Sequence, residues 1–128
     1  MAIYRNIDDF TAGNTYAIIR NTTPASNGFD LPSDAWFTVK NNLTDNDSMA
    51  VLQVHITTSG TVNGLITINP DNSSVLTFIS LVTNSYNMQP LGTFFYDIKI
   101  KMLPSGYVYT LETGKLFTTE GVTTLPSS

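Results

Sequence analysis

The strongest constraint on this chain is a repeat of period two, in which apolar residues alternate with polar residues along short segments. Residues 93–101 (TFFYDIKIK) show it most clearly, with Phe94, Tyr96, Ile98 and Ile100 on one side and a mainly charged set on the other. Successive side chains of a β-strand point to opposite sides, so this repeat is typical of a strand with one buried face. The segment therefore predicts a half-buried strand of an antiparallel sheet.

Further strands are predicted from the same alternation, between turns marked by Gly, Pro, Asn and Asp. Residues 34–40 (DAWFTVK) place Phe37 and Val39 on the inner face and Trp36 on the outer face. Gly114 is expected to break the last strand region in two, which gives a meander of three antiparallel strands. The predicted strands are residues 16–20, 34–40, 49–58, 64–69, 93–101, 107–112 and 115–119.

One apolar segment has two interpretations. Residues 75–82 (VLTFISLV) fit a buried strand, and they fit equally a short helix that begins with Asp71 or Asn72 as its N-cap. Periodicity alone leaves both open. Residues 83–91 are expected to form a loop.

The close spacing of the strands favours an all-β fold, an immunoglobulin-like antiparallel β-sandwich, with a jelly roll as the alternative. The length of 128 residues suits one such domain, so residues 1–128 are expected to form a single unit. Residues 1–13 and 120–128 lack strand periodicity and are expected to be extended N-terminal and C-terminal arms. Because cysteine is absent, neither disulfides nor thiolate metal sites are available.

The composition indicates a polar but largely neutral surface. Charged residues make up only 12% of the chain, and such a surface suits subunits that pack against one another. A net charge of −4 with six scattered cations argues against nucleic-acid binding. The first ten residues lack the apolar core of a signal peptide, and no apolar stretch approaches the length of a membrane helix. We therefore expect synthesis in the cytoplasm and no membrane association.

The residues that carry chemistry in other proteins do not form a recognisable set here. His55 is the single histidine, and it is expected on the outer face of a strand, without an orienting partner. Asp45 and Asp47 share the start of a calcium loop but lack its glycine and its distant glutamate. The glycines are isolated turn residues, which excludes a phosphate-binding loop. The sequence therefore predicts a protein that is not an enzyme, with no catalytic residue, no cofactor and no metal.

Two aromatic residues are the remaining candidates for function. Alternation places Trp36 and Phe95 on the outer faces of their strands, where a sandwich normally has polar residues. Aromatic side chains on such a face indicate a covered surface, and we interpret the pair as candidate interface residues. The competing interpretation, that Trp36 is part of the core, is equally compatible with the sequence.

The ordered series of segments resembles a known family. The segments are residues 36–56 (WFTVKNNLTDNDSMAVLQVHI), 64–74 (GLITINPDNSS) and 92–123 (GTFFYDIKIKMLPSGYVYTLETGKLFTTEGVT). Their order and spacing over residues 29–123 are similar to those of the small Ig-like domain of bacteriophage tail and baseplate proteins, as in the N-terminal domain of phage baseplate upper proteins. The chain departs from that pattern in residues 75–91, where the family has a shorter connection.

The resemblance implies a structural component of a virion, in the tail, baseplate or neck, that holds other phage structural proteins and forms a homo-oligomer. A capsid decoration, or cement, protein is the first alternative, because the same fold could bridge capsomers. A carbohydrate-binding or receptor-binding module is the second. That alternative predicts aromatic residues clustered in loops, whereas here most fall within predicted strands.

Overall fold

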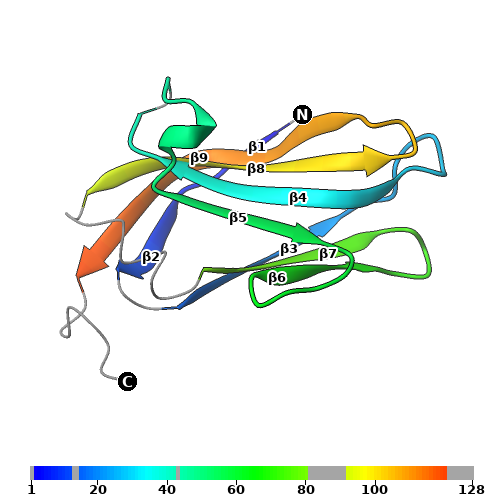
Figure 1. Ribbon diagram of the computed structural model, residues 1–128, viewed down its shortest axis with the longest axis horizontal. Coiled ribbons are helices and arrows are strands. Elements are labelled where there is room, and N and C mark those ends of the chain that lie inside the picture. Colours follow the sequence, from blue (N-terminus) through cyan, green and yellow to red (C-terminus); the bar gives the residue numbers. More distant parts are fainter. Residues whose placement is uncertain (1, 13–14, 43, 81–91, 121–128) are drawn as a thin grey trace.

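The computed structural model describes residues 2–12, 15–42, 44–80 and 92–120, and these residues form two β-sheets packed face to face (Figure 1). The large sheet has the order β1-β9-β8-β4-β5, with β2 on the same edge of β9 as β1, and the small sheet has the order β3-β7-β6. One turn of 3-10 helix, η1, lies between β4 and β5. The elements are β1 (Ile3–Tyr4), β2 (Ile7–Ala12), β3 (Tyr16–Thr22), β4 (Leu31–Lys40), η1 (Asp47–Met49), β5 (Leu52–Thr57), β6 (Gly64–Ile68), β7 (Ser74–Ser80), β8 (Thr93–Leu103) and β9 (Val108–Glu120).

The strand order is that of an immunoglobulin-like sandwich. Strands β4, β8 and β9 take the places of C, F and G, and β5 extends their sheet as C′ does. Strands β3, β7 and β6 correspond to B, E and D of the opposite sheet. The first strand is divided into β1 and β2, which run parallel to β9, while the other strand pairs are antiparallel. The predicted immunoglobulin-like β-sandwich is confirmed, and the described strands do not form the alternative jelly roll.

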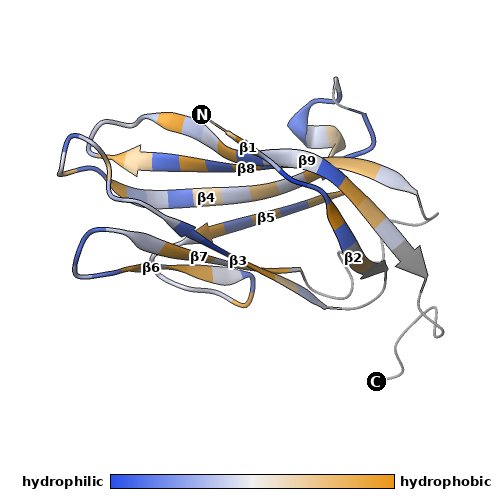
Figure 2. Ribbon diagram, turned by 180° about the vertical axis from the view of Figure 1, so that it is seen from behind, coloured by the Kyte–Doolittle hydropathy of each residue, from blue (hydrophilic) through white to orange (hydrophobic). Residues whose placement is uncertain are grey.

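The core lies between the sheets and follows the predicted alternation. The residues predicted to face inward on β4, β5 and β8 are buried. In Figure 2 the bands of high and low hydropathy alternate along β8 accordingly. Phe37 is 1% exposed at the centre, with ring centroids 6.0 Å from Phe78 and 5.7 Å from Tyr96. The strand interpretation of residues 75–82 is correct as far as Ser80, since β7 buries Leu76 and Phe78 in this core.

The prediction of an N-terminal arm over residues 1–13 was wrong. Strands β1 and β2 pair with β9, and Ile7 and Phe10 are buried in the core. The register between β2 and β9 is irregular between these two residues. The bulge turns both side chains inward although they are three positions apart, so no period of two appears in the sequence.

The expected break at Gly114 was also wrong, because β9 runs through it without interruption and pairs with β8 as a two-stranded hairpin. Gly114 is buried beneath the N-terminal segment. A Cβ atom at this position would overlap the backbone carbonyl of Arg5. The glycine therefore permits a close approach of two backbones and does not end a strand.

Two predictions fall on residues outside the described part of the chain: the loop over residues 83–91, and the C-terminal arm over residues 120–128 except for Glu120, which is the last residue of β9. In the described ranges, no helix has the length and hydrophobicity needed to cross a membrane.

Candidate functional site

The outer face of the large sheet collects every lysine of the chain. Lys40 extends from β4, Lys99 and Lys101 from β8, and Lys115 from β9. The register places their outward side chains in cross-strand rows with aromatic and polar residues. We call this surface the lysine face. Its rows, from β9 to β5, are Lys115-Phe95-Lys40, Thr113-Asp97-Thr38-Gln53, Thr110-Lys99-Trp36-His55 and Val108-Lys101-Asp34-Thr57.

Trp36 lies on this face, as predicted, and the alternative core placement is wrong. Its indole ring is half-buried and stacks on the ring of His55, with centroids 5.0 Å apart and an interplanar angle of 5°. His55 Nε2 lies 2.8 Å from Asp34 Oδ2, and the Ser33 hydroxyl donates to Asp34 Oδ1 (2.8 Å). These two hydrogen bonds, that from Ser33 first, lower the pKa of Asp34. Trp36 is thus held in place from the β5 side.

Phe95, the second predicted interface residue, also lies on the lysine face and is half-buried. Its cross-strand neighbours are Lys40 on β4 and Lys115 on β9. Phe95 and Trp36 belong to different rows, so the structure places both predicted residues on one surface without direct pairing between them. Their role as interface residues remains a prediction.

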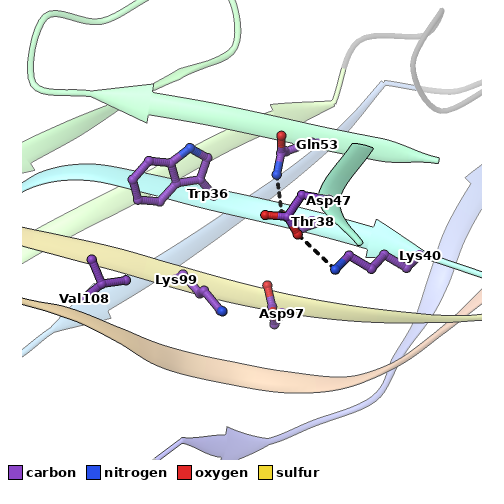
Figure 3. Close-up of a pocket in the computed structure, with 8 residues that line it drawn as sticks. All are labelled: Trp36, Thr38, Lys40, Asp47, Gln53, Asp97, Lys99 and Val108. Carbon is purple, nitrogen blue, oxygen red and sulfur yellow. Dashed lines mark hydrogen bonds and ion pairs between the residues drawn. The ribbon is translucent and has the colours of Figure 1, made fainter. Parts of the chain in front are cut away.

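A hollow of about 370 Å³ lies over β4 and β8 next to Trp36 (Figure 3). Thr38 and Gln53 lie on its β4 and β5 side, where Gln53 Nε2 donates to Thr38 Oγ1 (3.1 Å). Lys40 Nζ forms an ion pair with Asp47 Oδ1 of η1 (2.9 Å). The lining consists of Trp36, Thr38, Lys40, Asp47, Gln53, Asp97, Lys99 and Val108.

Asp97 is the unusual member of this lining. Its carboxylate is half-buried, and within the described ranges no side chain or backbone group donates a hydrogen bond to it. Burial raises the pKa of Asp97, while Lys99 and Lys40 act in the opposite direction and Asp47 adds to the increase. A partly dehydrated carboxylate without a donor is costly, and it gains free energy from any hydrogen-bond donor that enters the hollow.

The His55–Asp34 pair does not have the geometry of a nucleophile-activating triad. In a triad the imidazole lies between the hydroxyl and the carboxylate. Here Ser33 donates directly to Asp34, so its hydroxyl is on the far side of the carboxylate from His55. The pair orients Trp36. Among the described residues, no group of three or more histidine and carboxylate side chains is arranged to hold a metal ion.

A buried charged network ties the two sheets together. Arg20 of β3 donates from Nε and Nη2 to the two carboxylate oxygens of Glu112 on β9, at 2.7 and 3.0 Å. The Tyr96 hydroxyl donates to Glu112 Oε2 (2.6 Å), and the Arg5 carbonyl oxygen is a second acceptor 2.9 Å away. Burial, together with the Glu112 carboxylate, raises the pKa of Tyr96. The network anchors β3, β8, β9 and the N-terminal segment to one another.

The outer face of the small sheet has the opposite character and carries no charged residue on its three strands. Its central row is Ile19-Thr77-Leu65, in which Ile19 is 59% exposed. A shallow hollow of about 470 Å³, also without charged residues in its lining, adjoins the β6 edge. We call this surface the uncharged face. Its outward residues are Ala17, Ile19, Asn21, Leu65, Thr67, Val75, Thr77 and Ile79.

The sequence reasoning found two members of the lysine face and missed its other important residues. Alternation alone puts Asp97 and Lys99 on the same side as Phe95, but the register that brings them to Trp36 depends on strand pairing. The Arg20–Glu112 network was not predicted. Arg20 on an inward position of an apolar strand was a signal that a buried partner must exist.

Comparisons with known proteins add little beyond this architecture. The chain matches no protein-family model, and it matches no curated protein. Among solved structures it is similar to the NK cell receptor Nkp44, described as a triggering partner in natural cytotoxicity. The similarity has a TM-score of 0.46 and 14% identity, over 93% of this chain and 99% of that one. At this level the similarity supports no functional argument, and the fold assignment depends on the sheet topology.

Proposed function

We propose that the chain is a structural protein of a bacteriophage virion, an Ig-like module of the tail, baseplate or neck whose copies pack together through the uncharged face. The observation that carries the proposal is the division of the surface: all lysines lie on one sheet face and no charge lies on the other. The family resemblance of residues 36–56, 64–74 and 92–123 supports the phage context.

The uncharged face suits burial against protein. Two large apolar side chains are exposed in its central row, Ile19 at 59% and Leu65 at 38%. A charge that is buried at a subunit contact without a partner is costly. Burying the uncharged face avoids this cost.

A second copy of the chain is the partner that this face fits. Two copies each carry a net charge of −4 and repel one another, yet the uncharged face adds nothing to that repulsion. A self-complementary contact gives two-fold symmetry, the commonest arrangement of homo-oligomers. Three short strands cover only on the order of 350 Å², below the roughly 800 Å² per partner of a standard interface. Association through this face alone is therefore expected to be weak and to depend on concentration.

Substitution Ile19→Lys is expected to weaken self-association by at least about tenfold, because each contact would then bury two ammonium groups without partners. The measurement is light scattering coupled to size-exclusion chromatography over a series of protein concentrations. Wild-type protein should increase in average mass with concentration, and the variant should remain monomeric over the same range.

Tyr107→Lys is the matched control, since Tyr107 is 66% exposed in the turn between β8 and β9, away from the uncharged face. It introduces the same charge and should leave self-association unchanged. Loss of association in Trp36→Ala or Phe95→Ala, with Ile19→Lys unaffected, would assign the contact to the lysine face and contradict the proposal.

A further inference from the structure

The lysine face would remain open in an assembly formed through the opposite sheet, and its hollow has the composition of a small-molecule site. Pockets for small ligands combine an aromatic or apolar wall with a few convergent polar groups. Here Trp36 and Val108 supply the walls, and the polar groups extend from β4, β5, β8 and η1 (Figure 3).

The indole ring of Trp36 is already ordered in a position where a flat ligand could stack on it. His55 stacks against one face of the ring, and the indole lines the hollow together with Lys99 of β8 and Val108 of β9. The hydrogen bond from His55 to Asp34 fixes this arrangement before any ligand arrives. A ring that is already ordered loses little conformational entropy when it binds a flat partner.

The charges of the lining cancel. Lys40 and Lys99 face Asp47 and Asp97, and Lys40 is already paired with Asp47 at 2.9 Å. An anion such as a phosphate would meet two carboxylates, and a cation would meet two ammonium groups. The lining therefore favours a neutral ligand.

The hollow contains both a hydrogen-bond donor and hydrogen-bond acceptors that are not used by other described residues. The Asp97 carboxylate accepts, the Lys99 ammonium donates, and neither forms a hydrogen bond with another described residue. The Gln53 amide donates to Thr38 and keeps its oxygen as an acceptor. Hydroxyl groups, which donate and accept at once, are the ligand groups that satisfy such a set.

We infer that the hollow binds the ring of a neutral sugar, with the apolar face of a pyranose stacked on Trp36 and its hydroxyls bonded to Asp97, Lys99 and Gln53. The inference does not depend on self-association, because it uses the sheet face opposite to the uncharged face. The site has the size for one or two rings, and binding of a single ring is expected with a dissociation constant on the order of 1 mM.

The test uses intrinsic fluorescence, because Trp36 is the only tryptophan in the chain and reports directly on the hollow. The full chain is titrated with methyl α-glucoside, methyl β-galactoside and N-acetylglucosamine, and with glucuronate and glucosamine as charged comparisons. At least one neutral sugar should give a saturable change in emission, and its charged relative should bind more weakly.

Asp97→Asn should weaken binding of that sugar by about tenfold or more, because the strongest acceptor of the hollow loses its charge. Asp8→Asn is the matched control, since Asp8 is an exposed carboxylate of β2 outside the hollow, and it should bind as the wild type does. Trp36→Ala removes the fluorophore, so it is examined by saturation-transfer NMR, in which the sugar signal should disappear.

Three outcomes would overturn the inference. The first is no saturable response to any neutral sugar up to about 100 mM, roughly 100 times the expected constant. The second is equal affinity of Asp97→Asn and wild type. The third is a change in Trp36 emission with protein concentration alone, which would make the hollow a protein contact. Ile19→Lys should bind sugar normally, so failure of self-association and failure of sugar binding are distinguishable.

Discussion

Substitution Glu112→Ala is expected to lower the free energy of unfolding by about 3–5 kcal/mol, as measured by urea denaturation. The Glu112 side chain is 2% exposed and accepts two hydrogen bonds from Arg20 and one from Tyr96. Removing it leaves a largely buried guanidinium and a buried hydroxyl without their acceptor. That cost is far larger than the net value of the intact pair.

The same network predicts a dependence of stability on pH. Burial raises the pKa of Glu112, but the hydrogen bonds from Arg20 and Tyr96 outweigh burial, so its pKa lies below the ordinary value. The unfolded chain, with a glutamate pKa of about 4.3, therefore takes up the proton first as the pH falls. The contribution of the Glu112 carboxylate to stability is complete above that value, and it is lost as the pH falls through the lowered pKa of the folded state. Glu112→Gln should show a smaller loss of stability in acid than the wild type.

Asp47→Ala provides the control for these measurements. Asp47 also belongs to an ion pair, with Lys40 at 2.9 Å, but its side chain is 77% exposed. Exposed pairs contribute about 0–1 kcal/mol, so this variant should be nearly as stable as the wild type. Equal effects of Asp47→Ala and Glu112→Ala would contradict the placement of Glu112 inside the sandwich.

Phe37→Ala is expected to cost about 3–5 kcal/mol of unfolding free energy, since it leaves a cavity at the centre of the core. The Phe37 ring is 1% exposed and contacts Phe78 of the small sheet and Tyr96 of the large sheet. Loss of this ring therefore removes contacts between the two layers as well as within one of them.

The adjacent residue supplies the control. Trp36 has the larger side chain but points to the lysine face, where it is half-buried and stacks on His55. Trp36→Ala should therefore cost only about 1 kcal/mol, the value of an aromatic pair at a surface. A greater loss of unfolding free energy in Trp36→Ala than in Phe37→Ala would indicate that Trp36, and not Phe37, faces the core. That result would contradict the placement of Trp36 on the lysine face.

The sequence was a good guide to structure wherever one side of a strand is buried and the other is not. Residues 93–101 and 34–40 alternate cleanly because β8 and β4 are each paired on both edges, and the one register shift within these lengths, at Ile98 and Lys99, places the extra residue in β9 and not in β8. The first strand was not predicted because the bulge between Ile7 and Phe10 interrupts the alternation of apolar and polar residues. Gly114 was misinterpreted because a glycine that admits a neighbouring backbone looks the same in the sequence as one that forms a turn.

The candidate site was less accessible to prediction for a related reason. Alternation assigns Trp36 and Phe95 to an outer face, but it says nothing about which residues of other strands lie beside them. The hollow arises from the register that sets Trp36 opposite Lys99 and Thr38 opposite Asp97. Register is set by long-range pairing, which no local pattern of residues reports.

In the proposed assembly, the two faces of the sandwich would have separate roles. The uncharged face can be buried against a second copy without leaving a buried charge unpaired, while the lysine face keeps Trp36 and Asp97 available to a ligand. The buried Arg20–Glu112 pair between the sheets keeps both faces in a fixed relation. Attachment and presentation would then be divided between the two sheets.

The central proposal is that the chain is a phage virion protein, and its most direct test is quantitative mass spectrometry of purified phage particles. The proposal predicts that the protein is present at a fixed copy number of roughly a few to a few tens per particle, as closed rings of a tail or baseplate require. Hundreds of copies would instead favour the capsid decoration alternative. Absence from the particle would contradict a structural role in the virion.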